Sequence, residues 1–190
     1  MGYSLSWLAV RNISSESMLD RLALYPTGAR AAYATETVSG QALPDGWFLV
    51  VARGCDHRII SESALSSVSV DTEVVACSIE EHVMVSSSEG WGSGKRLWRV
   101  EHDGQESTRN LTTSGLLPDP FAKVHAQAIE DQDAEDAGAR EVDFFFEVPL
   151  VLAWEVVGFK HDENTSSLDY DDFEVFKSSK AVRQWWQIWK

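Results

Sequence analysis

Three consecutive β-rich runs in the middle of the chain constrain the fold more than any other feature. They cover residues 73–79, 82–88 and 96–102, and only a few residues separate each run from the next. Parallel neighbours need a crossover of a dozen or more residues, whereas antiparallel neighbours need only a tight turn. Residues 89–95 contain three glycines, which suits a hairpin loop between the last two runs. The sequence therefore predicts antiparallel strands at the centre of the fold.

Shorter runs on both sides of this region extend the pattern. Further strands are expected at residues 3–9, 47–52, 109–113, 142–146 and 173–176. Helices are expected at residues 18–22 and 60–68, after Pro120 and from Val148 onward, whereas residues 27–46 are small and polar and suggest a loop. Strands and helices interleave without regular alternation, which favours an α+β fold with a mainly antiparallel sheet and three to five helices packed on it. Residues 1–176 are expected to form one domain, followed by a basic, Trp-rich tail at 177–190.

Two of the expected helices carry apolar residues at helical spacing. In the helix that begins at Val148, the spacing places Leu150, Val151, Trp154 and Val157 on the inward face, and Gly158 takes the usual stop position. The helix after Pro120 has one apolar face and continues into an acidic stretch at residues 130–136, which is expected to be frayed or solvated.

The balance of charge excludes some partners and favours others. The chain has 30 acidic and 16 basic residues, a formal net charge of −14. A free-standing nucleic-acid binder needs clustered Lys and Arg, so no nucleic-acid partner is expected. Residues 129–174 hold 15 of the 30 acidic residues against only Arg140 and Lys160. Such a surface keeps a protein soluble and attracts basic partners.

The cysteines and the apolar segments indicate a reducing compartment. Only Cys55 and Cys77 are present, and a secreted disulfide framework normally has more. The apolar stretch near residue 8 is short and has no basic residues before it, so no signal peptide is expected. The longest later apolar run, residues 144–159, is interrupted by Glu147, Pro149 and Glu155 and does not suit a bilayer. A cytoplasmic protein without a membrane partner is therefore expected.

Five segments resemble a group of uncharacterised bacterial proteins that have no assigned function. The segments are YSLSWLAVR at residues 3–11, LPDGWFLVVA at 43–52, VVACSIEEHVMVSS at 74–87, EGWGSGKRLWRVEHD at 89–103 and VPLVLAWEVVGFKHDE at 148–163. Because they are spread over most of the chain, the resemblance is to a whole domain. It implies a bacterial, cytoplasmic origin and supplies no activity, cofactor or catalytic residue.

The densest group of ionisable residues lies at the ends of the predicted hairpin strands. It consists of the triplets Glu80, Glu81, His82 and Glu101, His102, Asp103. If the two triplets face each other, two imidazoles and several carboxylates could ligate a divalent metal or perform acid–base chemistry. A shift of one residue in register would move each side chain to the opposite face, and charged residues at strand ends are often only solvated. The functional interpretation therefore depends on whether His82 and His102 converge.

Other motifs give weaker signals. Trp91, between two glycines, is either an exposed recognition tip or a side chain folded over the core. Residues 92–95 lack the spacing of a phosphate-binding loop, and an EF-hand that begins at Asp162 fails at its sixth and twelfth positions. No catalytic residue, cofactor or metal is predicted.

The end of the chain differs in composition from what precedes it. After Glu174 there are four basic residues and no acidic one, and a helix from residue 180 would place Val182, Trp185, Trp186 and Trp189 on one side. This surface is expected to dock on the parent domain or on a second copy.

Three functions are compatible with these features. The leading hypothesis is a non-enzymatic, acidic interaction module for a basic protein partner, for example an inhibitor or immunity-type protein that neutralises a basic toxin. The first alternative is a small enzyme or metal-binding protein that uses the region of Glu81, His82, Glu101 and His102. The second alternative is a structural homodimer that forms through the Trp-rich tail.

Overall fold

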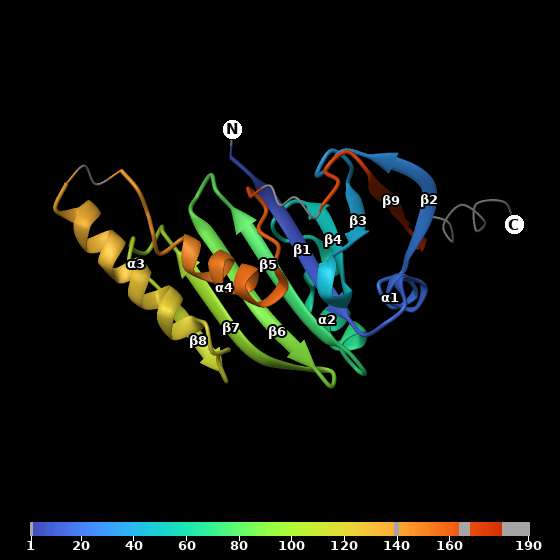
Figure 1. Ribbon diagram of the computed structural model, residues 1–190, viewed down its shortest axis with the longest axis horizontal. Helices are drawn as coiled ribbons and strands as arrows, with labels where there is room; N and C mark the ends of the chain where they lie inside the picture. The colour runs from blue at the N-terminus through green and yellow to red at the C-terminus, as the bar shows by residue number, and fades with distance from the viewer. Residues whose placement is uncertain (1, 139–140, 164–167, 180–190) are drawn as a thin grey trace, which may run out of the picture.

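The protein is built around one nine-stranded antiparallel sheet, seen in the computed structural model in Figure 1. The structure describes residues 2–138, 141–163 and 168–179. The sheet has the strand order β2-β9-β3-β4-β1-β5-β6-β7-β8. The strands are β1 (Ser4–Arg11), β2 (Leu24–Ala31), β3 (Val38–Ala42), β4 (Trp47–Arg53), β5 (Glu73–Glu80), β6 (Val85–Gly92), β7 (Lys95–Asp103), β8 (Thr112–Gly115) and β9 (Phe173–Ser178). The first strand is thus central, and the last described strand is inserted between β2 and β3.

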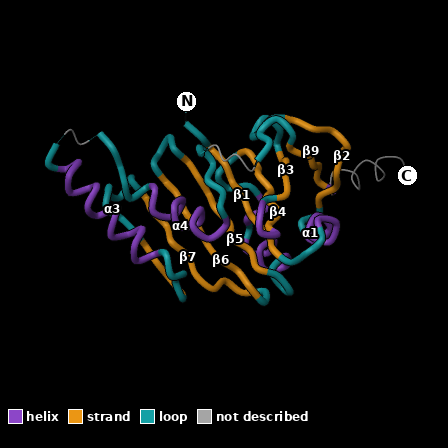
Figure 2. The backbone as a smooth tube through the Cα atoms, in the orientation of Figure 1, coloured by secondary structure: helices purple, strands orange, loops and turns teal. Residues whose placement is uncertain are grey.

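Alternation along the central strands divides the core into two layers. Trp7 in β1 and Cys77 in β5 face one side of the sheet, whereas their neighbours Leu8 and Ala76 face the other. Helices α3 (Phe121–Asp136) and α4 (Glu147–Val157) cover the Trp7 face. Helices α1 (Ser15–Arg21) and α2 (Glu62–Val68) cover the Leu8 face, together with the short 3-10 helix η2 (Arg58–Ile60). Figure 2 shows α3 and α4 next to β6 and β7, and α1 next to β2 and β9. A further 3-10 turn, η1 (Pro44–Gly46), leads into β4.

The expected α+β fold with a mainly antiparallel sheet is confirmed, and four α-helices pack on the sheet within the described part of the chain. The central hairpin runs further than expected, because β6 continues to Gly92 and only Ser93 and Gly94 form the turn. The last strand continues to Ser178. No helix among the described residues has both the length and the apolar character needed to cross a bilayer.

The expectation of a loop at residues 27–46 was wrong, because this segment contributes to β2 and forms β3. The sequence hides both strands, since β2 contains Pro26 and Gly28 and half of its residues are exposed at the edge of the sheet. In β3, Gly40 lies so close to the backbone of Leu49 that a Cβ atom would collide with its carbonyl oxygen. Small residues are required there, and they weaken the apolar signal that identifies a buried strand.

The expected strand at residues 142–146 was also wrong. The carboxylate of Asp143 accepts hydrogen bonds from the backbone N–H groups of Phe145 and Phe146, both at 3.1 Å. These bonds satisfy the amides of the turn that leads into α4, so the segment forms this turn instead of joining a sheet.

Candidate functional site

The ionisable residues singled out by the sequence each bond to a partner of their own. His82 lies in the turn after β5, and its Nδ1 is 2.6 Å from Oε1 of Glu80. Hydrogen bonds from Ser4 and His82 hold the pKa of Glu80 at about 2. Glu81 points to a different partner, because its Oε1 is 3.0 Å from Nε2 of the buried His161. The two carboxylates beside His82 therefore serve separate contacts.

His102 is fully buried and has its own carboxylate. Its Nδ1 is 2.6 Å from the carbonyl oxygen of Asn110, and its Nε2 is 3.0 Å from Oδ2 of Asp143. Both partner atoms are oxygens that can accept a hydrogen bond, so the ring is held at both of its nitrogens. Because Asp143 also bonds the backbone amides of the turn that leads into α4, this contact fastens β7 to the start of that helix. The side chain has no access to a substrate and serves packing.

Glu101 and Trp91 lie on the other face of the sheet from His102. The guanidinium of Arg99 bridges Glu101 at 2.8 Å and Glu89 at 3.6 Å. Trp91 in β6 is only 4% exposed and packs with the Leu8 layer, and the guanidinium of Arg96 lies 5.8 Å from its ring centre. Trp91 is therefore part of the core and not an exposed recognition tip.

The predicted site residues thus occupy separate surroundings, each with its own partners. Throughout the described ranges, no three His, Cys, Asp or Glu side chains gather where they could hold a metal ion. Trp185, Trp186 and Trp189 lie outside the described residues.

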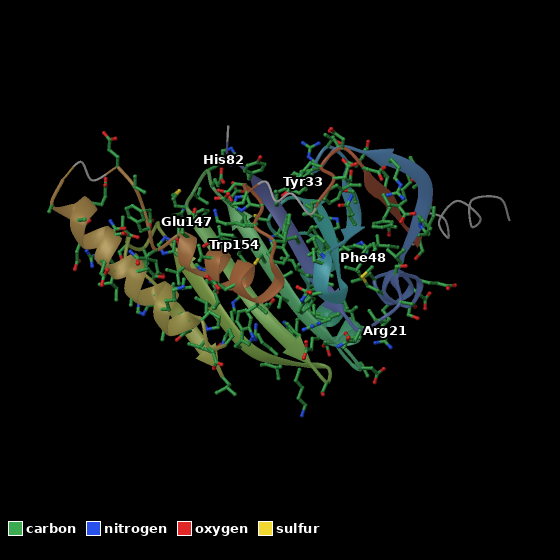
Figure 3. The ribbon with its side chains drawn as sticks, in the orientation of Figure 1. Arg21, Tyr33, Phe48, His82, Glu147 and Trp154 are labelled. Atoms are coloured by element: carbon green, nitrogen blue, oxygen red, sulfur yellow. The ribbon has the colours of Figure 1, made fainter. Side chains whose placement is uncertain are left out.

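The surface feature best suited to binding is a groove between α3 and α4, with a cavity volume of about 240 Å³. We call it the α3–α4 groove. Apolar and charged side chains from both helices line it, and Phe144 from the preceding loop completes its floor. Its lining residues are Lys123, Val124, Gln127, Ala128, Asp131, Phe144, Glu147, Val148, Val151 and Glu155. Figure 3 labels Glu147 on α4, together with Trp154, which is 39% exposed.

The two helices leave this groove open because neither has a narrow apolar stripe. In α4, buried side chains occur at consecutive positions from Val148 to Leu150 and again at Leu152 and Ala153. The prediction from helical spacing that Trp154 faces inward was therefore wrong, because this side chain is exposed. Val151, also predicted to face inward, is half-buried and lines the groove. In α3 only Val124, Ala128 and Gln132 are buried, so this helix touches the rest of the protein along a thin line.

The acidic end of α3 remains helical up to Asp136, so this stretch does not fray, and its acidic side chains are exposed or half-buried, as the solvated alternative predicted. Arg109, in the loop before β8, contacts this end of the helix. One of its guanidinium nitrogens lies 2.7 Å from a carboxylate oxygen of Asp133 and also forms an ion pair with Asp136. The side-chain oxygen of Gln132 also accepts a hydrogen bond of 2.9 Å from the backbone N–H of Phe144. These contacts offset the repulsion between neighbouring carboxylates that predicted fraying.

Electrostatically, the rim of the groove is acidic. Helices α3 and α4 together have seven acidic residues, five on α3 and two on α4, against Lys123. Lys160 neutralises Glu147, with its Nζ at 3.0 Å. Burial opposes the charged form of Lys160, but the carboxylates of Asp162 and Glu147 outweigh that effect and raise its pKa. Neither Asp131 nor Glu155 forms an ion pair with any residue that the structure describes.

An apolar floor, with rim carboxylates that form no ion pair among the described residues, suits a ligand that has apolar side chains flanked by cations. The sequence showed the ingredients, namely the apolar face that begins at Phe121 and the acidic stretch after it. It did not show that α3 and α4 lie side by side, because that depends on the docking of Asp143 and Arg109.

Comparison of the chain with protein-family models, with curated proteins and with solved structures gives no match in any of the three.

Proposed function

We propose that this protein is a non-enzymatic interaction module whose α3–α4 groove binds a basic segment of a protein partner. The observation that carries the proposal is the combination of an apolar floor with two rim carboxylates, Asp131 and Glu155, that have no ion-pair partner among the described residues. The floor contributes affinity through burial of apolar area. The carboxylates select cationic partners and accelerate their approach.

The shape of the groove favours a helical ligand. Two helices that pack side by side leave a furrow, and an amphipathic helix can lay its apolar face into it with anchors one turn apart. Leu, Ile or aromatic residues would contact Val124 and Val151, while Lys or Arg at the flanks would meet Asp131 and Glu155. An inhibitor or immunity-type protein that covers the positive surface of a basic toxin is one concrete form of this function.

The enzymatic alternative has less support. It required the carboxylates and histidines of the β5–β7 region to point at a common substrate. His102 is 0% exposed and uses both ring nitrogens internally, and Glu81 and Glu101 are each bonded to a side chain of this protein.

A synthetic peptide of leucine and lysine, with leucines at helical spacing, tests the proposal. We expect the intact protein to bind it, and the double variant Asp131→Lys/Glu155→Lys to bind at least about tenfold more weakly, because two attractions become repulsions. Titration calorimetry at about 50 mM and about 500 mM salt should show weaker binding at high salt.

The matched control is Glu36→Lys/Glu62→Lys, which changes the net charge equally at exposed positions outside the groove. This variant should keep most of the affinity. If both variants lose affinity equally, the attraction comes from the overall charge and not from the groove, and the proposal fails.

A further inference from the structure

A second groove lies at the far end of the sheet, between helix α1, edge strand β2 and β9. It has a volume of about 520 Å³ and is lined by Ser15, Glu16, Leu19, Asp20, Leu24, Pro26 and Glu174. We call it the α1–β2 groove. It lies on the Leu8 face of the sheet, whereas the α3–α4 groove lies on the Trp7 face. The two sites are therefore separate.

The lining of the α1–β2 groove carries negative charge that no basic lining residue neutralises. It includes three carboxylates, Glu16, Asp20 and Glu174, and no basic residue. None of the three forms an ion pair within the described part of the chain. Arg30, which is opposite Glu174 in the β2–β9 ladder, pairs instead with Asp172 at 3.6 Å. Such a cluster attracts a cationic ligand.

The chain leaves β9 beside this groove. Ser178 is paired with Leu24 of β2, and the backbone N–H and the Oγ of Ser179 both donate to the carbonyl oxygen of Ala23, at 2.8 and 3.1 Å. Ala23 follows the end of α1, so Ser179, the last described residue, lies where α1 and β2 meet. The C-terminal segment is therefore attached beside the groove.

The composition of that segment complements the lining of the groove. Residues 180–190 carry three cations and no acid, and the other side chains are mainly large and apolar. The cations are Lys180, Arg183 and Lys190, and the apolar residues are Ala181, Val182, Trp185, Trp186, Ile188 and Trp189. Basic residues can meet the three carboxylates while indole rings cover Leu19, Leu24 and Pro26.

We propose that residues 180–190 dock into the α1–β2 groove of their own molecule. Tethering supports this choice, because a segment attached at the edge of its site has a very high effective concentration there. Eleven residues span at most roughly 36 Å extended and roughly 16 Å as a helix. The α3–α4 groove is a poor intramolecular alternative, because it lies on the opposite face of the sheet. In addition, α4 packs over β6, five strand positions from β9, or roughly 24 Å away, which exceeds the length of the segment as a helix.

Docking there also protects the sheet. β2 is an edge strand, and its outer backbone groups are a template for pairing with another chain. A segment folded over α1 and β2 covers that edge, so the basic end would keep the acidic domain from associating edge to edge.

Limited trypsin digestion tests the proposal on the intact chain, with a synthetic peptide of residues 177–190 as the undocked reference. Trypsin cleaves after Lys180 and Arg183, and cleavage follows the undocked population. We expect cleavage at these two sites to be at least about tenfold slower in the protein than in the peptide, at a rate independent of protein concentration.

The variant Glu16→Gln/Asp20→Asn/Glu174→Gln removes the carboxylates without adding a trypsin site. It should be cleaved at least about fivefold faster than the unmodified protein at low salt. The matched control Glu36→Gln/Asp45→Asn/Glu62→Gln should retain protection, because it removes the same charge elsewhere.

Three outcomes would overturn the proposal. The first is cleavage of the protein as fast as that of the peptide. The second is protection that rises with protein concentration, which would indicate docking on a second copy. The third is protection that is unchanged in the groove variant. If that variant does not fold, deletion of residues 180–190 gives an independent test. Amide hydrogen exchange should then increase in α1 and β2 and remain unchanged in α4, and the reverse pattern would contradict the proposal.

Discussion

At the scale of single residues, the buried pair of His102 and Asp143 has the greatest structural consequence. Asp143 accepts bonds from His102 and from the backbone N–H groups of Phe145 and Phe146. One carboxylate thus bonds a buried imidazole and holds the turn that leads into α4, the helix that supplies half of the α3–α4 groove. Loss of this carboxylate would leave a buried ring nitrogen and two backbone amides without their acceptor, and buried polar groups without partners are costly.

We therefore expect Asp143→Ala to lower the free energy of unfolding by about 2–4 kcal/mol, measured by urea denaturation. The control Asp119→Ala removes an exposed carboxylate before α3 and should change stability by less than about 0.5 kcal/mol. Replacing His102 by Leu in the Asp143→Ala background should recover part of the loss. A loss below about 1 kcal/mol in Asp143→Ala would contradict this role of the carboxylate.

The sequence identified the ionisable residues at the strand ends but not their partners. Glu81, His82, Glu101 and His102 all form side-chain contacts, and two of these contacts join residues far apart along the chain. His102 bonds Asp143, 41 positions away, and Glu81 bonds His161, 80 positions away. Such pairings depend on register and loop paths, which local patterns do not specify.

At the scale of elements, the β6–β7 hairpin depends on close packing between a glycine and an indole. A Cβ atom on Gly90 would collide with the ring of Trp98 on β7, which packs under α3 and α4. Gly90 is therefore required for Trp98 to lie flat across its neighbour strand, and Trp98 in turn forms part of the core beneath the groove.

Gly90→Ala should lower the free energy of unfolding by about 1–3 kcal/mol, because the indole must move within a packed core. Gly92→Ala in the same strand is the control, since its Cβ would meet only Cδ1 of the exposed Leu97, at 3.2 Å. Thermal unfolding of the two variants should place Gly90→Ala clearly below Gly92→Ala. Equal melting temperatures would mean that Trp98 is free to shift.

Elements with a strong apolar pattern were predictable, and elements without one were not. β1, β4 and β5 lie at the centre of the sheet and have long apolar runs, so their positions agreed with expectation. β2 and β3 were missed because edge exposure and close backbone packing select Pro, Gly and Ser. Helix α4 has apolar residues on nearly every side, so its sequence does not specify which face is buried. For this reason the predicted inward position of Trp154 was wrong.

At the scale of the whole molecule, a sheet covered on both faces separates two acidic grooves. The formal net charge of −14 attracts basic partners in general, but attraction alone does not localise them. We propose that the α3–α4 groove supplies the localisation, because Asp131 and Glu155, which form no ion pair with any described residue, border an apolar floor there. The acidity could be read from the sequence and the interaction module is a proposal, whereas the position of the groove follows from the tertiary packing of α3 on α4.

Amide hydrogen exchange on the intact chain, with and without a saturating leucine–lysine peptide, tests this account most directly. We predict slower exchange in α3 and α4, with little change in α2 on the opposite face. Protection confined to other elements, or no protection of α3 and α4 at saturation, would contradict it.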